Sequence, residues 1–463
     1  MATTVHPMTT TALIPPTIEP PDKPLSLPVF CYRFIKNPLL ALPQPAYEEP
    51  IFVYRPSGDK ALVAWVTDPQ LTETVLQNKD NTFIKTTLEL RALGRPLGDG
   101  VLTSDGAQWR WQRHAIAPLF RHSEVLGYVP AMAAAADDLV AQWRSDGAAT
   151  RQIETDMTDV TFSVIARTML VGGEPAESAA IKHATDRYLS AVPWEMVWEL
   201  IRMPQWLPHP MVWRLDRTAQ GVRKAVAGII ARRRNAGQEG TDLLARLLQA
   251  RHPETGAPMD DERLIDNLLT LLLAGHETTA KALTWSLYLL ALAPEWQDRV
   301  RAEVNAVLGD QPISPERIDA LEITERVLKE AMRLYPPVPV MARRPLHDIT
   351  LGGHLIPAGT QVVIPMYCVH RHRALWSDPD EFRPDRFLPD NARHMPRTQY
   401  MPFGAGARTC IGMSFAMIEA KVLLATFLRA ARFSCDDGHR PIPVSRITLR
   451  PKGGMPLGVQ LLQ

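Results

Sequence analysis

The sequence predicts a mainly helical fold with small β-sheets, an α+β class, and three observations support this expectation. Long segments with helical periodicity recur along the chain, whereas the segments that alternate as strands do are short and few. Hydrophobic residues make up 46% of the 463 residues, so the chain can bury a large core. Length alone would suggest two or three domains.

The elements follow in order along the chain. Ile51–Tyr54 alternates like a strand, residues 57–59 read Ser-Gly-Asp, and residues 61–66 return, which predicts a hairpin. Asp68 followed by Pro69 is typical of a helix start. Helices are expected over 123–143, 158–170, 218–235, 260–293, Pro294–Leu308, 323–334 and 413–433, and further strand pairs over 349–364 and 447–462.

The most specific motif lies near the C-terminal end, where residues 403–412 read Phe-Gly-Ala-Gly-Ala-Arg-Thr-Cys-Ile-Gly. A thiol binds metal as the thiolate, and the start of a helix behind Cys410 favours that negative charge. Three glycines let the loop lie close to a flat ligand, and Arg408 is suited to pairing with a carboxylate. We expect an iron ligand at Cys410; a buried structural cysteine in a glycine-rich turn is the alternative.

The spacing Phe-x-x-Gly-x-Arg-x-Cys-x-Gly, from Phe403 to Gly412, closely resembles the haem-thiolate signature of the cytochrome P450 family. The resemblance implies the fold of that family as a single large haem domain. It also implies haem b (iron protoporphyrin IX), with Cys410 as the axial thiolate ligand and with Phe403, Arg408 and Gly412 as further haem-binding residues. In this family the thiolate pushes electron density to the iron and favours O–O cleavage.

A second segment, residues 268–292, is strongly apolar but carries His276, Glu277 and Lys281. Charges at the centre of a membrane span are costly, so we expect a long buried helix instead. His276 and Glu277 also begin a zinc-protease motif. That motif needs a second histidine at the position of Ala280, which excludes it.

Residues 274–279, in the middle of this helix, read Ala-Gly-His-Glu-Thr-Thr. Gly275 and Thr278 are poor helix formers, and a threonine hydroxyl can bond back to a carbonyl one turn earlier and bend the helix. The string resembles the oxygen-binding box of the family, which implies that Ala274 and Gly275 face the haem. It also implies that Glu277 and Thr278 deliver protons during oxygen activation. Without the cysteine motif, an ordinary core helix would be the preferred interpretation.

A third motif is Glu330-x-x-Arg333, at the end of a helix that two prolines stop. Most such pairs lie on the surface and contribute roughly 0.3 to 0.5 kcal/mol. The motif is similar, however, to one whose members in this family join an arginine from a later Pro-x-Arg-Phe segment in a buried network behind the haem. That segment is Pro384–Phe387 here, which implies a structural network of Glu330, Arg333 and Arg386.

Two further positions match haem-propionate contacts of the family. The spacing Trp109-x-x-x-Arg113 places both side chains on one helix face, so each could reach a propionate. Arg343 follows a proline-containing stretch and fits a third contact. With Arg408, these arginines would surround two carboxylates, while simple packing is the alternative for Trp109.

The motifs come from distant parts of the sequence yet would surround one cofactor, so no domain boundary is expected between them. We therefore expect a proline-rich N-terminal segment over 1–45 and one haem domain over 46–463. The formal net charge is +1, so nothing indicates a nucleic-acid partner. The beginning of the chain lacks the basic start and apolar stretch of a signal peptide or membrane anchor, which indicates a soluble, bacterial-type member.

The four cysteines, Cys31, Cys368, Cys410 and Cys435, show no pairing pattern of a disulfide scaffold. A reducing cytoplasm is therefore the expected location. No fused flavin or iron-sulfur reductase is expected, so electrons would come from a ferredoxin or flavodoxin with its NAD(P)H reductase. Arg397 and Arg408 are candidate contacts for such an acidic donor, and a solvated loop arginine is the alternative for Arg397.

By resemblance, the substrate pocket would be lined by residues 83–102, 188–206, 271–278 and 338–341. The second of these segments is rich in tryptophan and methionine, which suits an adaptable apolar entrance, a membrane-surface contact or core packing. An apolar substrate follows, with fatty acids, terpenoids, steroids and aromatic compounds all open. The 274–279 string resembles that of fatty-acid hydroxylases in the family, and this resemblance tips the choice slightly towards a medium or long aliphatic chain.

Three functions compete on this sequence. The first is a monooxygenase that inserts one atom of O2 into a C–H bond. The second is a peroxide-driven hydroxylase or decarboxylase, against which Glu277 and Thr278 argue because peroxide brings its own protons. The third is a haem-thiolate sensor without turnover, which should also carry an output domain.

Overall fold

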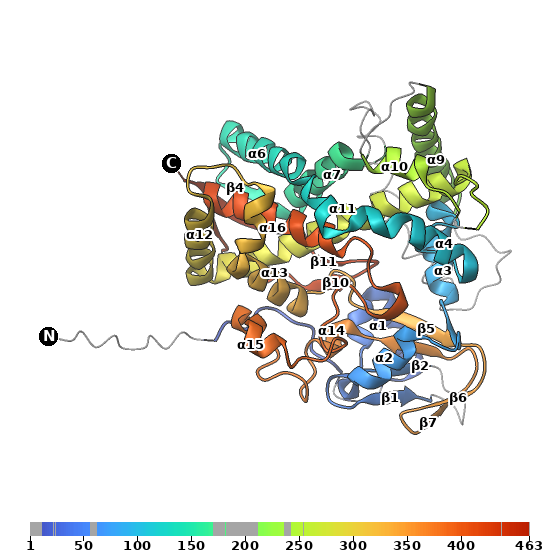
Figure 1. Cartoon of the computed structure of the whole chain (residues 1–463). Helices are drawn as coiled ribbons and strands as arrows, with labels where there is room; N and C mark the ends of the chain where they lie inside the picture. Colours follow the sequence, from blue (N-terminus) through green and yellow to red (C-terminus); the bar gives the residue numbers. More distant parts are fainter. Residues whose placement is uncertain are drawn as a thin grey trace.

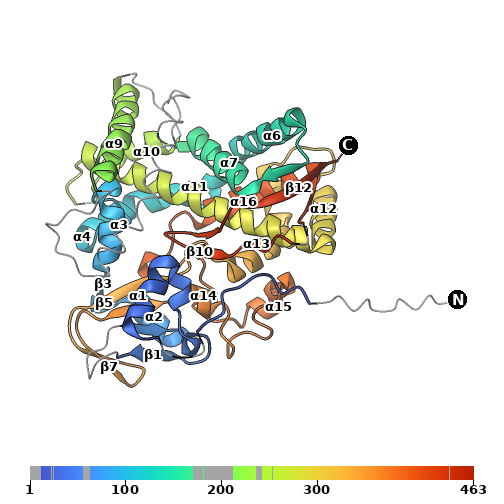
Figure 2. The ribbon, with the colours of Figure 1, turned by 180° about the vertical axis from the view of Figure 1, so that it is seen from behind.

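The computed structural model describes residues 12–21, 23, 25–55, 63–169, 181, 212–235, 242–252, 254–436 and 438–462. Helices dominate this part of the chain and its strands are short, which confirms the predicted α+β class. Most of the helices gather in one half of the molecule, and the largest sheet lies in the other half (Figures 1 and 2).

The described helices vary widely in length. The α-helices are α1 (Leu27–Lys36), α2 (Pro69–Gln77), α3 (Thr87–Leu97), α4 (Gly106–Ile116), α5 (His122–Leu126), α6 (Val129–Asp146), α7 (Ile153–Met169), α9 (Val212–Asn235), α10 (Leu243–Gln249), α11 (Asp261–Leu292), α12 (Pro294–Leu308), α13 (Glu322–Leu334), α14 (Met366–Val369), α15 (Pro389–Ala392) and α16 (Met413–Ala430). The 3₁₀ helices are η1 (Pro38–Ala41), η2 (Gln44–Tyr47), η3 (Ala117–Phe120), η4 (Pro315–Ala320), η5 (Pro384–Phe387) and η6 (Gly406–Arg408).

α11 crosses the centre of the helical half (Figure 1). The side chain of Asp260 accepts a hydrogen bond from the backbone N–H of Arg263 at 2.9 Å and so caps its first turn. Pro294 opens α12, and because the residue before a proline avoids helical backbone angles, α11 ends just ahead of it. α7, α13 and α16 pack against α11. The helix expected over 260–293 is thus confirmed as a buried one.

Several other helices differ from expectation at their ends. The single helix expected over 123–143 is two helices, α5 and α6, because Gly127 ends the first and Pro130 sits in the first turn of the second. α7 and α9 begin earlier than predicted. The helix expected over 413–433 ends at Ala430, and the next residues form strand β9 (Ala431–Ser434).

The largest sheet has five strands in the order β1-β2-β8-β5-β3. β1 (Ile51–Tyr54) pairs antiparallel with β2 (Val63–Val66), Ile51 opposite Val66, which confirms the predicted hairpin. The turn expected at 57–59 lies outside the described residues. β8 (Gln361–Ile364) joins β2 in parallel, and β5 (Met341–Pro345) lies antiparallel between β8 and β3 (Phe83–Ile84).

The remaining sheets are small. β6 (Ile349–Leu351) and β7 (His354–Ile356) form a hairpin, as the 349–364 pattern predicts. The prediction of a strand pair over 447–462 is wrong in its pairing. β11 (Leu449–Pro451) pairs with β10 (Pro443–Ser445), whereas β12 (Pro456–Leu461) pairs with β4 (Thr150–Gln152) and β9. Pairing with strands from elsewhere in the chain leaves no pattern in the local sequence.

The described part of the N-terminal segment packs on the rest of the domain. The Tyr335 hydroxyl donates to the Pro16 carbonyl at 2.6 Å, and the Thr17 and Tyr367 hydroxyls are 2.9 Å apart. The Asn37 side chain donates to the Pro443 carbonyl at 3.0 Å. Residues 12–45 are thus tied to the helices and sheets that follow them, wherever they are described. Among the described helices, none has the length and hydropathy that crossing a bilayer requires.

Candidate functional site

Cys410 ends a loop whose shape depends on glycine. Gly404 and Gly406 both have φ near +70°, a conformation that glycine adopts without strain. A side chain at Gly406 would also place its Cβ 2.3 Å from the backbone oxygen of Leu76 in α2. The Cys410 backbone N–H donates to the Phe403 carbonyl at 2.9 Å and closes the loop just before α16. Two of the glycines that the motif contains are therefore required by the backbone itself.

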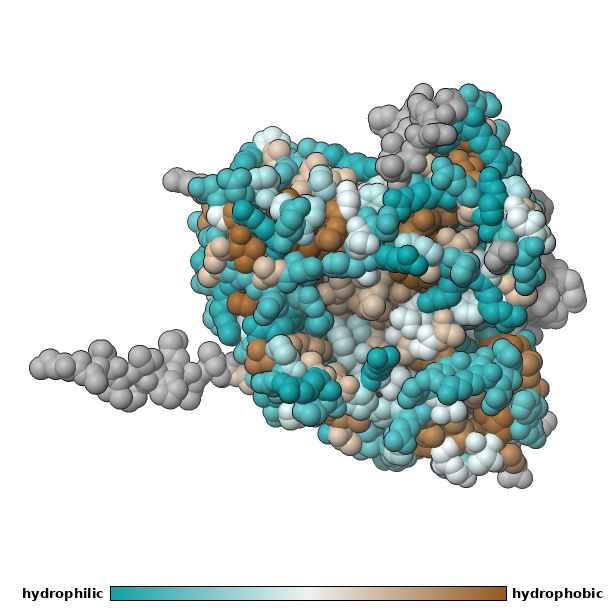
Figure 3. Space-filling view, viewed as in Figure 1, coloured by the Kyte–Doolittle hydropathy of each residue, from teal (hydrophilic) through white to brown (hydrophobic). Residues whose placement is uncertain are grey.

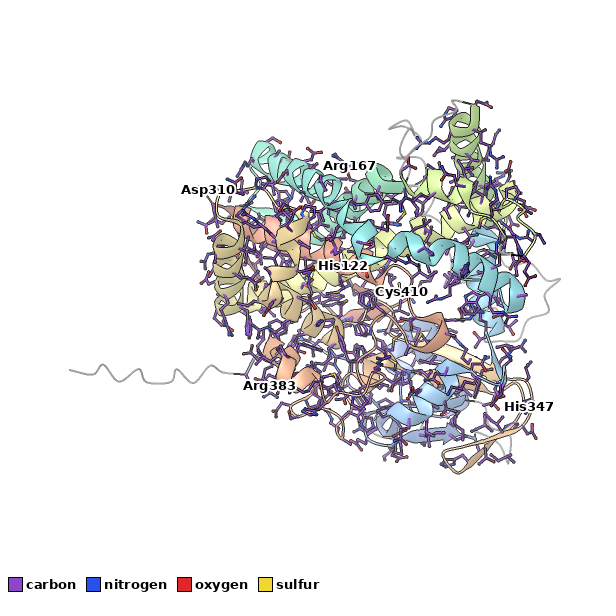
Figure 4. All side chains as sticks on the ribbon, in the orientation of Figure 1. His122, Arg167, Asp310, His347, Arg383 and Cys410 are labelled. Carbon is purple, nitrogen blue, oxygen red and sulfur yellow. The ribbon has the colours of Figure 1, made fainter. Side chains whose placement is uncertain are left out.

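The thiol of Cys410 is accessible, although protein surrounds it closely. Burial raises the pKa of the Cys410 thiol, while the Gly412 backbone N–H and the Arg113 guanidinium oppose that rise. Arg113 Nη2 donates to the Thr409 carbonyl at 2.9 Å, next to the cysteine. Cys410 lies near the middle of the molecule, and apolar and weakly polar side chains gather in the middle of the same face (Figures 3 and 4). An exposed cysteine beside a guanidinium is suited to metal binding as the thiolate.

The middle of α11 presents a partly accessible face in an otherwise buried helix. Ala274 is exposed and Thr278 is partly exposed, whereas His276 and Ala280 are buried. The Thr278 hydroxyl donates to the Ala274 carbonyl at 2.7 Å, which confirms the predicted bond one turn back. α11 nevertheless remains α-helical along its whole length.

Gly275 has a packing role in the structure. A Cβ at this position would lie 2.7 Å from Cδ1 of Ile165 in α7, so a larger residue would require the Ile165 side chain to shift. Its missing side chain therefore points towards α7. The predicted contact of Gly275 with a haem stays a prediction, and it would have to involve the backbone.

Glu277 is buried and ionised among polar partners. Its Oε1 accepts from Thr448 Oγ1 at 2.9 Å and from Arg450 Nη2 at 2.7 Å, and Lys281 Nζ lies 3.7 Å away. Burial on its own would raise the pKa of Glu277, but Lys281 and Arg450, with help from His276 and Thr448, lower it on balance. The sequence offered no signal that Thr448 and Arg450, some 170 residues further on, bind this carboxylate.

The three arginines predicted as propionate contacts lie in one neighbourhood. The guanidinium carbon of Arg408 lies 4.3 Å from the centroid of the Trp109 ring, and the guanidinium carbon of Arg113 lies 5.8 Å from it. Burial lowers the pKa of Arg408, and the charges of Arg343 and Arg113 act on it in the same direction. α4, η6 and β5 therefore bring these side chains together.

The structure adds three charged residues that sequence reasoning missed. Lys85 Nζ lies 2.7 Å from Glu89 Oε1, and Arg343 Nη1 lies 3.7 Å from Glu89 Oε2. Arg408 donates to the Asp105 carboxylate and to the Ser104 carbonyl, the latter at 3.0 Å. The only sequence signal was the four-residue spacing of Lys85 and Glu89. We call Lys85, Arg113, Arg343 and Arg408 the cationic cluster.

Glu330 and Arg333 form a buried network with Arg386, the third predicted member. Arg333 Nε and Nη2 donate to the two Glu330 carboxylate oxygens at 2.7 and 2.8 Å. Arg386 Nε lies 3.3 Å from Glu330 Oε1, which also accepts from the Arg383 backbone N–H at 2.8 Å. Arg333 further donates to the carbonyls of His370, Pro379 and Glu381. Glu330 and Arg333 are both fully buried, so this pair is no surface pair.

A second buried acid, Glu419 in α16, lies beside Thr279 of α11. Burial raises the pKa of Glu419 well above its ordinary range, and the Thr279 hydroxyl only partly opposes this. Burial thus favours the neutral form of Glu419. Glu419 belongs to α16, the helix behind Cys410, and Thr279 follows Thr278 in α11.

The segments predicted to line a pocket are only partly described. Residues 83–102, 271–278 and 338–341 include the cluster residue Lys85 and the exposed Ala274. Residues 188–206, with their tryptophans and methionines, lie outside the described residues.

Comparison with known proteins identifies the family. The sequence matches the Cytochrome P450 family over residues 41–457. It is 32% identical over 430 residues to an 11-oxo-beta-amyrin 30-oxidase from Glycyrrhiza uralensis, covering 89% of this chain and 80% of the relative. A cyclooctat-9-en-7-ol 5-monooxygenase from Streptomyces melanosporofaciens is 34% identical, over 75% of this chain and 74% of the relative. The crystal structure of the cytochrome P450DA heme domain superposes with a TM-score of 0.77, at 28% identity and 90% coverage of both chains.

The chain belongs to the cytochrome P450 family and is a P450 monooxygenase. Membership of this family implies a haem-thiolate cofactor. The residues present fit such a group on two independent grounds. Cys410 is exposed, and the four cations of the cluster exceed the two nearby carboxylates, Glu89 and Asp105, by two charges.

Proposed function

We propose that this enzyme hydroxylates an apolar small molecule, with terpenoids as the first class to test, using O2 and two electrons from a separate redox partner. The observation that carries the proposal is the accessible Cys410 thiol, held by a glycine loop next to Arg113. Bound haem b with this thiolate would supply the oxygen-activating chemistry. The cationic cluster would hold the two propionates, with Trp109, Phe403 and Gly412 around the macrocycle.

Two side chains of α11 would handle protons. The Thr278 hydroxyl reaches accessible surface and donates to the Ala274 carbonyl, so its oxygen can still accept a second hydrogen bond. Glu277 is next to it in sequence, ionised and held by Lys281 and Arg450. In this proposal, Thr278 Oγ1 orients a proton donor at the reacting centre, and the Glu277 carboxylate is the acid–base group that passes protons from solvent.

The substrate class rests on the relatives and on the accessible face of α11. The two relatives described above act on 11-oxo-beta-amyrin and on cyclooctat-9-en-7-ol, as their names state. Ala274 is an apolar, exposed residue in the middle of a core helix, as the lining of an apolar pocket would be. Fatty acids, steroids and aromatic compounds should be tested beside the terpenoids. Titration of each compound into the haem protein, read as a change of spin state, ranks them.

The partners and location are proposed from charge and cysteine chemistry. None of the four cysteines, all within the described part of the chain, forms a disulfide, which suits a reducing cytoplasm. A ferredoxin or flavodoxin with its NAD(P)H reductase would supply the electrons, as in a soluble, bacterial-type member of the family. Arg397 is exposed and free to meet an acidic donor, whereas Arg408 is mostly covered and engaged by Asp105. Arg397→Glu should therefore slow electron transfer from the partner.

The cofactor assignment is tested by absorption spectra of the reduced protein exposed to carbon monoxide. Wild type should show the strongly red-shifted Soret band of a thiolate-ligated haem, and Cys410→Ser should lose it. Cys435→Ser is the matched control because it removes a thiol elsewhere, and it should keep the band. Wild-type protein without haem, or with the band of a histidine-ligated haem, would contradict the assignment.

The proton-delivery assignment is tested by Thr278→Ala. We expect NAD(P)H oxidation to persist, with peroxide released and little hydroxylated product. Thr279→Ala is the matched control on the neighbouring residue. Unchanged product yield in Thr278→Ala would favour the peroxide-driven alternative, in which the oxidant brings its own protons.

A further inference from the structure

Lys85 is the least accessible member of the cationic cluster. Its side chain is 3% exposed, whereas those of Arg343 and Arg408 are 13% and 20% exposed. An ammonium group taken out of water is stable only when it is paired and hydrogen-bonded. Lys85 Nζ meets this need through Glu89 Oε1 at 2.7 Å and through the Leu102 carbonyl.

Glu89 reaches more than one cation. Its Oε1 faces Lys85 and its Oε2 lies 3.7 Å from Arg343 Nη1. Glu89 is thus the carboxylate that α3 supplies between Lys85, which precedes that helix, and Arg343 of β5. Asp105 pairs with Arg408.

We propose that Glu89 is a positioning residue of the haem site, which keeps Lys85 a charged donor to a propionate alongside Arg343 and Arg408. This inference rests on the proposed role of the cluster in holding the propionates. It goes beyond that role because it assigns a function to Glu89, a carboxylate within a site whose cations would bind the carboxylates of the haem.

The charges that face Lys85 explain why it needs Glu89. Arg343 and Arg408 approach it from β5 and η6, and Arg344 Nε donates to its backbone carbonyl at 3.4 Å. Burial lowers the pKa of Lys85, the two arginines lower it further, and Glu89 raises it. Without the Glu89 charge, Lys85 would lose its proton at a lower pH than in wild type, because the protein charges that then act on it, those of Arg343 and Arg408, are repulsive. A neutral amine holds a propionate less well than an ammonium does.

The experiment measures haem loss from the reconstituted holoprotein to an excess of a haem acceptor protein, from pH 6 to pH 9.5. In Glu89→Gln, the dissociation rate should be near that of wild type at low pH. It should rise by about tenfold or more as pH increases, because a lost charge-assisted hydrogen bond is worth about that factor. Lys85→Met should show the high rate at every pH. Lys85→Arg combined with Glu89→Gln should restore slow dissociation, because a guanidinium does not lose its proton in this range.

Glu73→Gln is the matched control, since it removes one exposed carboxylate from α2 and should leave the profile unchanged. A Glu89→Gln profile that equals wild type would overturn the proposal. So would faster loss by the same factor at every pH without rescue by Lys85→Arg, because that is the behaviour of general structural damage. If Glu89→Gln fails to fold, Lys85→Met alone decides, since unchanged haem retention would exclude Lys85 as a donor. Wild-type protein that takes up no thiolate-ligated haem would instead contradict the proposed function.

Discussion

Arginines gather at two places in the molecule. The two places differ in whether the chain itself provides all the groups that accept hydrogen bonds from the arginines. In the Glu330 network, Arg333 is fully buried and every partner of its guanidinium comes from the chain itself, a carboxylate and three carbonyls. In the cationic cluster, four cations face two carboxylates and Arg408 keeps 20% of its side chain exposed. The closed network can only stabilise the fold. The cluster has positive charge left over for an acidic ligand.

The largest effect should come from breaking the closed network. Glu330→Gln leaves Arg333 and Arg386 buried without their carboxylate, which typically costs about 3 to 5 kcal/mol. We expect little folded, haem-loaded protein on expression and, in what is recovered, a correspondingly lower free energy of unfolding in urea. Glu322→Gln, at an exposed position of the same helix, is the control. Normal yield and stability in Glu330→Gln would mean that the two arginines find other acceptors.

The cluster should respond in the opposite sense, through the ligand rather than the fold. Arg408→Met removes one half-buried cation whose chain partners are Asp105 and the Ser104 carbonyl. Haem affinity should fall by about 10- to 100-fold, because a charge-assisted hydrogen bond is worth about 1.5 to 3 kcal/mol. The free energy of unfolding without haem should change by less than about 1 kcal/mol. Arg397→Met, at an exposed site, should change neither quantity, and a large loss of stability in Arg408→Met would remove the distinction between the two regions.

Glu277 lies between the closed network and the cationic cluster in character. Its partners, like those of Glu330, belong to the chain, but it is next to Thr278 on α11, where the reaction is proposed to occur. Its pKa lies below the ordinary value of 4.5 because Lys281, Arg450 and their neighbours outweigh the effect of burial. A carboxylate with a depressed pKa stabilises the fold above its ordinary pKa, and that stability is lost as pH falls through the folded value. Glu277→Gln should therefore lower the free energy of unfolding by about 1 to 3 kcal/mol at pH 7.

The difference between wild type and Glu277→Gln should shrink as pH falls below the ordinary value of 4.5 and through the depressed pKa of the folded state, because the wild-type carboxylate then becomes protonated. Urea unfolding of both proteins between pH 7 and pH 3 measures it. A difference that stays constant over this range would mean that shape, and not charge, is what Lys281 and Arg450 recognise at this position.

The sequence predicted the fold class, the central helix and the first hairpin, because these depend on local patterns. Apolar periodicity and an Asp cap define α11, and alternation defines β1 and β2. The pairing of β11 and β12 was predicted wrongly because their partners, β10, β4 and β9, are chosen by tertiary packing. Local patterns fix which residues form a strand, whereas its neighbours are fixed by the whole core.

The same division holds for the candidate site. Cys410, Glu330 and Arg333 belong to short strings with fixed spacing, and the structure brings their predicted neighbours together. Lys85, Asp105, Thr448 and Arg450 belong to no such string, so only the folded structure reveals that they contact site residues. Charge partners that come from remote loops leave no spacing to recognise.

The smallest effect should come from Trp109, whose ring lies against Arg408 and Arg113. A cation beside an aromatic face gains about 0.5 to 1 kcal/mol at a partly exposed site, which is roughly a two- to fivefold change in affinity. Trp109→Phe keeps a weaker aromatic face and should lower haem affinity less than Trp109→Leu does. Haem titration of the three proteins measures this order. Equal affinities in all three would show that Trp109 only fills space, and that the guanidinium groups of the cluster keep their places without it.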